Sequence, residues 1–309
     1  MMVTPVQLIG GVAADLLLGD PRWLPHPVVG MGKCAAWMER AWRRTRLPLR
    51  LAGVGAWCSV VAAACGVVWA SLRWLPEPYV QIYWIYSFLA VRSLDDHARA
   101  VVRALGERDI EGARASVAMM VGRDTERMDE RAVTRAMIES VAENLSDGVI
   151  APLFWLVVGG PVAMAGYKAV NTLDSMFGHK NERYREFGWC SARIDDVANW
   201  APARLTAALI WLLALVIPGL RFGESVRATL RDAHKQPSPN SGYPEAAAAG
   251  ALGVQLGGAA YYKGVLVEKA RLGFDGRALS VAVYGRLRVL LYAAPLVLCG
   301  LAIGGMRWL

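Results

Sequence analysis

Long apolar blocks without a single charged residue constrain this chain more than any other feature. The two longest cover residues 51–72 and 289–306, and an arginine bounds each block at both ends. A helix of about 20 residues crosses the hydrocarbon core of a bilayer, so blocks of this length favour spanning helices over buried helices of a soluble protein. The sequence therefore predicts an integral membrane protein.

Shorter apolar segments fit a spanning helix and a buried or re-entrant helix equally well. They cover residues 3–18, 78–91, 149–167, 205–220 and 246–262. Glycine and proline interrupt several of them, as at Gly159-Gly160-Pro161, and broken helices occur in membranes where protein or a wet cavity surrounds the backbone. We therefore expect an all-α fold, a polytopic integral membrane helical bundle with broken or re-entrant helices and helical cytoplasmic loops.

Basic residues in the connecting segments predict the orientation. Residues 22–50 hold seven basic residues against the single acid Glu39, and an excess of Lys and Arg marks a cytoplasmic loop. Residues 73–77 are short and should face outward, whereas residues 92–147 and 168–204 should be cytoplasmic, with residues 149–167 re-entrant or buried. This predicts a multi-pass protein of a bacterial inner membrane, in contact with the lipid bilayer, whose active site faces the cytoplasm.

The domain organisation follows from the same pattern. No long linker divides the chain, which predicts one membrane-embedded domain over residues 1–309. Within it, residues 92–148 form a cytoplasmic helical insertion, and residues 168–204 and 221–245 form polar active-site loops. The net charge of +8 fits basic cytoplasmic loops, and without an RNP motif, a zinc finger or a Lys/Arg tail no nucleic-acid partner is expected.

Three carboxylates share one face of a predicted helix just before residues 149–167. Glu139, Glu143 and Asp147 are spaced by four residues, so their like charges repel one another. A hard cation such as Mg²⁺ prefers carboxylate and phosphate oxygens and would relieve that repulsion. The pattern predicts Mg²⁺ as a cofactor held by these catalytic side chains, with a solvated helix face as the alternative.

Further polar residues flank the apolar segments, where uncompensated charge is costly and usually functional. Other candidate catalytic residues are His26, Asp174, Asp195, Asp196 and His234. Candidate substrate- and phosphate-binding residues are Arg123, Asp124, Thr125, Asn144, Lys168, Asn171, Thr172, Lys180, Arg193, Asn199, Arg204, Ser238, Asn240, Tyr243 and Glu245. Arg and Lys bind phosphate or carboxylate through charge-assisted hydrogen bonds. Helix capping and a solvated basic rim are the alternatives.

Common nucleotide and zinc motifs are missing from the sequence. There is no GxxxxGK[ST], no GxGxxG that opens a helix after a strand and no HExxH, so neither a P-loop nor a Rossmann unit nor a zinc site is expected. Residues 232–245 form a proline-rich loop with uncharged donors and acceptors, which suits a ligand that displays many amides. We expect this loop to close over the substrate, with an ordinary connecting turn as the alternative.

Six stretches of the chain are more specific together than any one short motif. They are Gly19-Asp20-Pro21 with Pro25-His26-Pro27-Val28; Val121-Gly122-Arg123-Asp124-Thr125; Glu139-Ser140-Val141-Ala142-Glu143-Asn144 with Asp147-Gly148; Tyr167-Lys168-Ala169-Val170-Asn171-Thr172-Leu173-Asp174-Ser175-Met176; Arg193-Ile194-Asp195-Asp196 with Asn199 and Pro202-Ala203-Arg204; and Ser238-Pro239-Asn240-Ser241-Gly242-Tyr243-Pro244-Glu245. In this order, along nearly the whole chain, they resemble the adenosylcobinamide-phosphate synthase (CobD/CbiB) family of cobalamin biosynthesis. Within the cores of these motifs, the sequence differs from the family pattern at Ser241, where the family has Ala.

The resemblance implies a reaction. Family members are thought to join a propionate carboxyl of adenosylcobyric acid to aminopropanol, or to its phosphate, as an amide, with ATP as co-substrate. The implied partners are the corrinoid, the amino alcohol and ATP, and a homo-oligomer or a complex with other membrane proteins of the pathway is compatible with the sequence. A base must deprotonate the incoming ammonium, and His26, His234 or a carboxylate could serve. The residues do not choose among them.

Two other classes of function stay open. Asp/Asn clusters at membrane edges also suit Mg²⁺-dependent membrane transferases of prenyl or alcohol phosphates, but the three acidic clusters here are dissimilar rather than repeated. A non-enzymatic membrane sensor or transporter is the second alternative, although the sequence lacks the internal symmetry of many transporters. ATP consumption that depends on the corrinoid and the amino alcohol would separate these classes.

Overall fold

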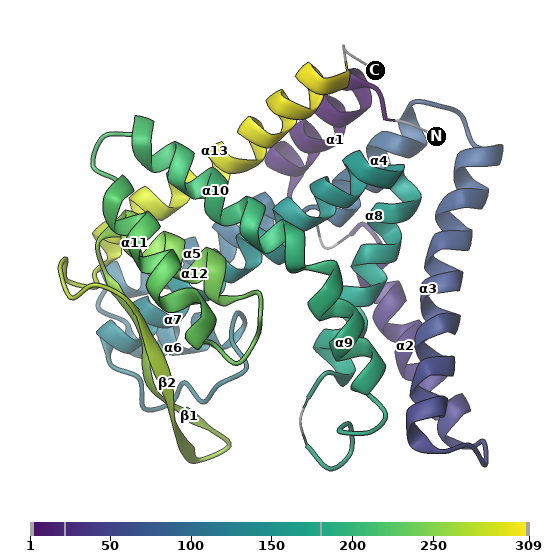
Figure 1. The fold of residues 1–309 in the computed structure, drawn as a ribbon, viewed down its shortest axis with the longest axis horizontal. Coiled ribbons are helices and arrows are strands. Elements are labelled where there is room, and N and C mark those ends of the chain that lie inside the picture. The colour runs from purple at the N-terminus through teal and green to yellow at the C-terminus, as the bar shows by residue number, and fades with distance from the viewer. Residues whose placement is uncertain (1–2, 22, 180, 307–309) are drawn as a thin grey trace. The chain divides into compact units, whose positions relative to one another are not determined.

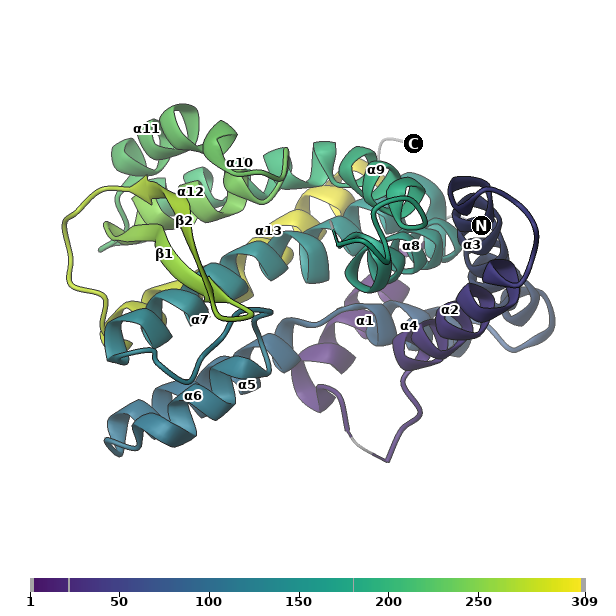
Figure 2. The ribbon, with the colours of Figure 1, turned by 90° about the horizontal axis from the view of Figure 1, so that it is seen from below.

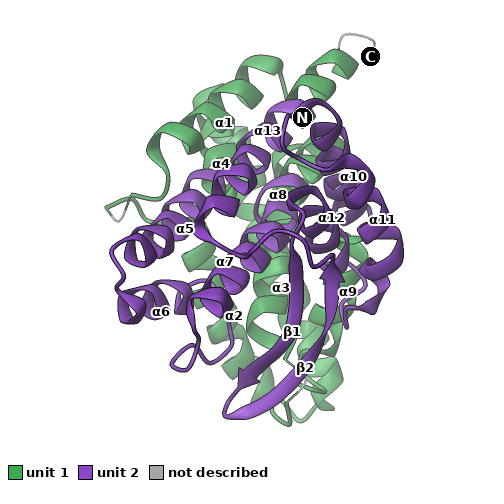
Figure 3. Cartoon of the chain, turned by 90° about the vertical axis from the view of Figure 1, so that its left-hand side faces the viewer, with its two compact units in different colours: residues 1–90, 151–200, 299–309 green, residues 91–150, 201–298 purple. Residues whose placement is uncertain are grey.

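The computed structural model describes residues 3–21, 23–179 and 181–306 (Figure 1; Figure 2). The chain was expected to form one domain, and its internal contacts divide it into two compact units, which Figure 3 shows in separate colours. Unit 1 comprises residues 1–90, 151–200 and 299–309, and unit 2 comprises residues 91–150 and 201–298. Each unit therefore combines segments that are far apart in the sequence.

Unit 1 is helical. Its helices are α1 (Pro5–Leu18), α2 (Pro27–Arg43), α3 (Leu49–Trp74), α4 (Tyr79–Phe88), α8 (Ala151–Phe177) and α9 (Trp189–Ala198). Polar residues set where the first two begin. Thr4 caps α1 in a reciprocal capping box with Gln7. His26 caps α2, because its Nδ1 accepts the N–H of Val28 at 3.3 Å.

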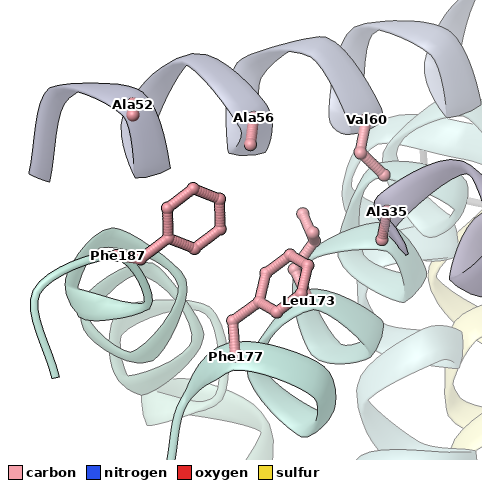
Figure 4. Close-up of a cluster of buried hydrophobic side chains, with 7 residues drawn as sticks. All are labelled: Ala35, Ala52, Ala56, Val60, Leu173, Phe177 and Phe187. Carbon is pink, nitrogen blue, oxygen red and sulfur yellow. The ribbon is translucent and has the colours of Figure 1, made fainter. Parts of the chain in front are cut away.

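Small residues let three helices of unit 1 pack around two phenylalanines (Figure 4). Ala35 of α2 and Ala52 and Ala56 of α3 are buried in one cluster with Phe177 of α8 and Phe187, which precedes α9. The two rings meet edge to face, with 5.4 Å between their centroids. Because lipid tails are as apolar as these side chains, close packing of small against large residues, more than the hydrophobic effect, stabilises helix association inside a bilayer.

The break predicted at Gly159-Gly160-Pro161 is present in α8. Gly160 has φ 73° and ψ −170°, a conformation that L side chains rarely adopt. Pro161 follows and lacks the N–H that would continue the helical hydrogen bonds. Figure 1 shows α8 as a bent ribbon. The break is confirmed, whereas re-entry of residues 149–167 into the membrane stays a prediction.

Among its described residues, unit 2 contains nine helical elements and a pair of strands. They are α5 (Val91–Gly106), α6 (Ile110–Ala118), α7 (Glu130–Asn144), the π-helix η1 (Leu145–Ile150), α10 (Trp200–Val216), α11 (Phe222–Asp232), the 3₁₀ turn η2 (Ala233–Lys235), α12 (Gly242–Leu252), β1 (Gln255–Tyr262), β2 (Val265–Gly273) and α13 (Val281–Met306). Two of these helices, α10 and α13, have some of their residues in unit 1. In this unit β1 contacts α7 and α12, and β2 contacts α11 and α12.

The apolar segment 246–262 does not form one helix, as a membrane segment would. α12 ends at Leu252, and the next residue, Gly253, caps it in the left-handed conformation with a φ of 68°. β1 begins two residues later and pairs with β2 in an antiparallel hairpin, the one sheet among the described residues. The hairpin therefore adds a β element to a fold that was predicted as all-α.

Both segments predicted as polar loops are largely helical. α8 continues to Phe177 and α9 covers residues 189–198, so helices take up much of residues 168–204. Within residues 221–245, α11 buries polar side chains at helical spacing. Those side chains have partners inside the unit; Ser225 Oγ, for example, donates to the Ala247 carbonyl at 2.7 Å. A buried polar face with satisfied hydrogen bonds is compatible with a helix, although its sequence looks like a loop.

Three helices among the described residues are long and apolar enough to cross a bilayer, namely Leu49–Trp74, Glu130–Phe177 and Val281–Met306. The bent pair Trp189–Ala198 and Trp200–Val216 would make a fourth span. The first and third contain the two longest charge-free blocks of the sequence. The prediction of a polytopic, predominantly helical membrane protein is therefore confirmed.

Candidate functional site

A polar cluster on α8 and α9, both in unit 1, brings several predicted site residues together. We call it the α8–α9 cluster, and its members are Tyr167, Asn171, Asp174, Asp195, Asp196 and Asn199. Tyr167 Oη donates to Asn199 Oδ1 at 2.8 Å, and Asn199 Nδ2 donates to Asp195 Oδ2 at 3.0 Å. Asn171 also hydrogen-bonds to Asp195. This chain of hydrogen bonds fixes the Asp195 carboxylate between the two helices.

The carboxylates of the α8–α9 cluster lie close enough for their charges to interact. Asp174 interacts electrostatically with Asp195 and Asp196, and His179 opposes their effect on Asp174. Asp195 Oδ1 is buried and has no hydrogen-bond partner among the described residues. Buried carboxylate oxygens normally have a partner, so this atom is suited to accept a hydrogen bond from a bound substrate.

Other predicted residues of unit 1 have different surroundings. Thr172 Oγ1 donates to the Lys168 carbonyl at 2.7 Å within α8, and the Lys168 side chain is buried. Arg193 is exposed on α9. Lys180 lies outside the described residues. Thr172 is therefore engaged with its own helix rather than with the polar chain that holds Asp195.

His26 lines two cavities of unit 1, of about 420 and 650 Å³. Its Nε2 lies 3.3 Å from Asp20 Oδ1, and its Nδ1 accepts the N–H of Val28. Both ring nitrogens therefore have partners close by in the sequence. This arrangement orients the turn that opens α2, and it occupies the atoms that a catalytic base would use.

Asp124, predicted to bind substrate, holds the β1–β2 hairpin in unit 2. Its carboxylate accepts the N–H of Lys263 at 3.0 Å and the N–H of Gly264 at 2.6 Å, at the turn of the hairpin. Its own N–H donates to the Tyr261 carbonyl at 2.9 Å. The structure therefore gives Asp124 a role in positioning the hairpin.

The three carboxylates predicted as Mg²⁺ ligands have different surroundings. Glu139 pairs with the buried guanidinium of Arg123 through Oε2, and its Oε1 accepts the Gly257 N–H at 2.7 Å. Glu143 is exposed, and Asp147 lies in the wider π-helical turn η1, which changes the side-chain spacing. Among the described residues no group of three or more His, Cys, Asp or Glu side chains could hold a metal ion. The assignment of these three carboxylates to Mg²⁺ stays a prediction.

Glu245, predicted only as a binding residue, lies among other acids of unit 2. It is buried in the first turn of α12 and accepts from Gln236 Nε2 at 2.8 Å. Burial raises the pKa of the Glu245 carboxyl, and the charges of Glu143 and Glu139 raise it further, while Lys269 of β2 opposes them. We call Glu139, Glu143, Glu245 and Lys269 the α7–α12 cluster. Within it, Glu245 exchanges a proton at a higher pH than an ordinary carboxyl.

Lys269 keeps its positive charge in this cluster. Burial lowers the pKa of the Lys269 ammonium, but a hydrogen bond with Tyr262 and the charge of Glu139 outweigh burial, so the pKa is raised overall. Lys269, together with the Arg123 guanidinium that pairs with Glu139, therefore places two cations beside the three carboxyl groups of the cluster.

The loop after η2 folds on itself and carries the predicted binding residues. Ser238 Oγ accepts the N–H groups of Asn240 at 3.2 Å and Ser241 at 3.3 Å. Arg204 of α10 holds the loop from outside: its Nη1 lies 3.5 Å from Asn240 Oδ1, and its guanidinium carbon lies 4.1 Å from the centroid of the Tyr243 ring. Arg204, Asn240 and Tyr243 are thus brought together, as a rigid wall for a ligand would require.

Some of the predicted site residues make contacts that stabilise the fold. Conversely, three residues that contact predicted site residues were not predicted from the sequence. Asn144 Nδ2 donates to a carbonyl of its own helix at 2.9 Å. Thr125 is buried, whereas His234 is exposed in η2. The residues that sequence reasoning missed are Tyr167, Gln236 and Lys269. Tyr167 is the first residue of a recognised motif and could have been found, but Lys269 lies in a strand that carries no motif.

Comparison with known proteins identifies the family. The sequence profile described as CobD/Cbib protein matches residues 8–290 of this chain. Two relatives named Cobalamin biosynthesis protein CobD, from Pelobacter propionicus and Geobacter metallireducens, are each 46% identical to it, over 300 and 302 residues. The matches cover 95% and 96% of this chain and 93% and 94% of the relatives.

A third relative carries the other family name. Cobalamin biosynthesis protein CbiB of Salmonella arizonae is 42% identical over 309 residues, which cover 96% of this chain and 95% of that protein. No solved structure matches the chain. Because both the profile and the relatives extend over nearly its full length, this chain belongs to the CobD/CbiB family of cobalamin biosynthesis proteins.

Proposed function

We propose that this protein forms an amide bond between a propionate carboxyl of adenosylcobyric acid and the amine of aminopropanol or aminopropanol phosphate, with consumption of ATP. Membership of the CobD/CbiB family supports a role in cobalamin biosynthesis. The structural observation that carries the reaction class is Glu245, a buried carboxyl with a raised pKa that lies among other acids. Such a group is suited to take a proton from an ammonium substrate.

A carboxylate must be activated before an amine can displace one of its oxygens. In the proposed reaction a carboxylate oxygen attacks the γ-phosphorus of ATP, the bond from that phosphorus to ADP breaks, and an acyl phosphate forms. The amine nitrogen then attacks the acyl carbon, and inorganic phosphate leaves with the electron pair of the C–O bond. Arginine side chains positioned at the phosphoryl group would stabilise the charge that develops there.

The amine must also lose protons. It arrives mainly as an ammonium ion, which has no electron pair for attack, so one proton leaves nitrogen before attack and a second leaves after it. Ionised Glu245 accepts the first proton in this proposal, because a carboxylate with a raised pKa is a stronger base than an ordinary one. The acids of the α7–α12 cluster would attract the ammonium ion to the same place.

Of the bases that the sequence left open, the geometry favours Glu245. The ring nitrogens of His26 already have partners, Asp20 and the Val28 N–H. His234 is exposed, where water competes with a substrate for its nitrogen atoms. No observation on the described residues favours a prenyl or alcohol-phosphate transferase, or a sensor, over the amide ligase.

Magnesium and the membrane orientation belong to the same proposal. We infer that Mg²⁺ enters with ATP, since this ion is usually bound by substrate phosphates with only one or two carboxylates from the protein. We also infer an inner-membrane protein whose reaction takes place on the cytoplasmic side, where ATP is available. The excess of basic residues in residues 22–50 supports that orientation.

The test uses the whole chain in nanodiscs with adenosylcobyric acid, ATP and Mg²⁺. Aminopropanol and its phosphate are supplied in separate reactions, the amide product is identified by mass spectrometry, and ADP and phosphate are quantified. We expect ADP and phosphate in amounts equal to the amide, and a preference for one of the two amines. Absence of an amide product would overturn the proposal, and AMP with pyrophosphate as products would overturn the acyl-phosphate step.

A further inference from the structure

A groove in unit 2 lies between α7 and the β1–β2 hairpin. It consists of two adjoining cavities of about 510 and 520 Å³. Asp129, Ala132, Arg135 and Ala259 line both cavities. Figure 2 shows the two strands beside α7, in agreement with the contact between β1 and that helix. We call this pair of cavities the arginine groove.

Five of the described arginines line the groove, and one of them, Arg123, was a predicted site residue that pairs with Glu139. Arg131 and Arg271 line the first cavity, Arg123 and Arg127 line the second, and Arg135 lines both. Arg131 and Arg135 are four residues apart on α7, so they share one face of the helix. Like charges at this spacing repel one another, and an anion bound between them would relieve that repulsion.

Arg135 lies where the two cavities meet and has hydrogen-bonding capacity to spare. Its Nη2 donates to the Ala259 carbonyl at 3.0 Å, whereas its Nε is buried and has no partner among the described residues. Gly258 has a φ of 86°, and a Cβ at this position would lie 3.2 Å from Arg135 Nη1. The glycine therefore leaves space for the guanidinium against β1. A buried donor without a partner indicates that a ligand completes the site.

The acids of the groove are either committed to the backbone or exposed. Asp129 Oδ1 accepts the Ala132 N–H at 2.7 Å as the cap of α7, and Asp124 accepts the N–H groups of the hairpin turn. Glu126, Glu268 and Asp275 are exposed, where solvent and salt screen their charges. The half-buried guanidinium of Arg135 is screened less, so the inner part of the groove favours an anion.

We propose that the arginine groove binds the phosphate groups of an anionic ligand. A guanidinium group binds two phosphate oxygens at once, which a carboxylate-lined groove could not do. Each of the two cavities exceeds the volume that a single phosphate ion needs and falls in the range of about 300–1,000 Å³ that small-molecule sites occupy. ATP is one source of such phosphates, and to that extent the inference rests on the proposed function; a phospholipid headgroup offers the same chemistry.

The test measures binding to the whole chain in nanodiscs, without turnover. The probes are a non-hydrolysable ATP analogue and tripolyphosphate in zwitterionic nanodiscs, and an anionic phospholipid whose retention by the protein is quantified. The groove variants are Arg135→Gln, Arg131→Gln and Arg271→Gln. Arg103→Gln is the matched control, because Arg103 is exposed on α5 of the same unit and does not line the groove. Arg131 and Arg271 are also exposed, so their variants test the groove even if Arg135→Gln fails to fold.

We expect each groove variant to weaken binding of the ATP analogue and tripolyphosphate by about tenfold or more, while the control stays within about twofold of wild type. A loss confined to the anionic phospholipid would support the groove and assign a headgroup as its ligand. Wild-type affinity of all groove variants for all three probes would overturn the inference. A wild-type protein that binds the probes through these arginines but makes no amide would refute the proposed function alone.

Discussion

The backbone N–H of Gly257 donates to Glu139 Oε1 at 2.7 Å, which ties β1 to α7. The other oxygen of the same carboxylate pairs with the buried guanidinium of Arg123. One side chain thus connects the motif around Arg123, the helix that carries the predicted metal ligands and the hairpin. Glu143, one turn further along α7, is exposed instead, so the two glutamates should respond differently to substitution.

Glu139→Ala should lower the free energy of unfolding by about 3–5 kcal/mol, because it leaves the buried Arg123 without its ion-pair partner and the Gly257 N–H without an acceptor. Thermal unfolding of the detergent-solubilised protein measures this loss. Glu143→Gln is the matched control for stability, and its Tm should lie close to that of the wild type. The same variant should lose most amide-forming activity at saturating Mg²⁺. A Glu139→Ala variant as stable as wild type would contradict the structural role, and wild-type turnover by Glu143→Gln would remove that residue from the reaction.

Glu245→Gln should lower kcat by about 10²–10⁴-fold, the usual contribution of a general base. In the wild type the rate should fall as the pH drops through the raised pKa of Glu245, because only the carboxylate accepts a proton. Gln236→Ala removes a hydrogen bond that lowers this pKa, so the acidic limb should move to higher pH. Profiles of kcat against pH measure both effects. If the limb persists in the Glu245→Gln variant, the base lies elsewhere.

The same carboxyl predicts how stability depends on pH. Its pKa in the folded protein lies above the ordinary value of 4.5, so the folded chain binds this proton more tightly than the unfolded chain does. The stability that Glu245 contributes is therefore fully present below the unfolded pKa and is lost as the pH rises through the folded pKa. Glu245→Gln should raise Tm at neutral pH and weaken this dependence. A lower Tm of the variant at neutral pH would argue against the raised pKa.

Among the carboxylates of the α8–α9 cluster, Asp195 should contribute most to kcat/KM. We expect Asp195→Asn to lower kcat/KM by about tenfold or more, and Tyr167→Phe by less, as the loss of a hydrogen bond worth about 0.5–1.5 kcal/mol implies. The effect of Tyr167→Phe should disappear in a chain that already carries Asn199→Ala, since Asn199 makes the contact to Asp195. A double-mutant cycle on kcat/KM tests this coupling. Additive effects would mean that the hydrogen bonds do not act as one chain.

A cysteine introduced by Asn181→Cys should react with a membrane-impermeant reagent only from the cytoplasmic side, in a variant whose five native cysteines are replaced. Asn181 is exposed and lies in a segment that the basic-residue pattern assigns to the cytoplasm. Glu77→Cys is the control, since it lies in the short connection after α3 that should face outward. Labelling of position 181 from the periplasm would refute the assignment and make residues 149–167 a complete span.

The sequence by itself determined the membrane helices and their main break. Residues 51–72 and 289–306 have no charged side chain over the length of a span, and they lie inside the spans Leu49–Trp74 and Val281–Met306. Hydropathy is a property of consecutive residues, so it needs no distant contact to act. The break at Gly160 follows in the same way from the backbone chemistry of glycine and the proline that comes next.

Only the tertiary structure decided what the polar residues do. Glu139 and Glu143 look equivalent along the helix, but a backbone donor 118 positions away makes Glu139 a structural residue. Asp124 likewise holds a turn whose N–H groups come 139 positions later or more. Arg135 and Arg271 meet in one groove only after β2 folds back beside β1. The energy of a charged side chain depends on the partners and solvent around it, and these are set by contacts between distant segments rather than by spacing along the chain.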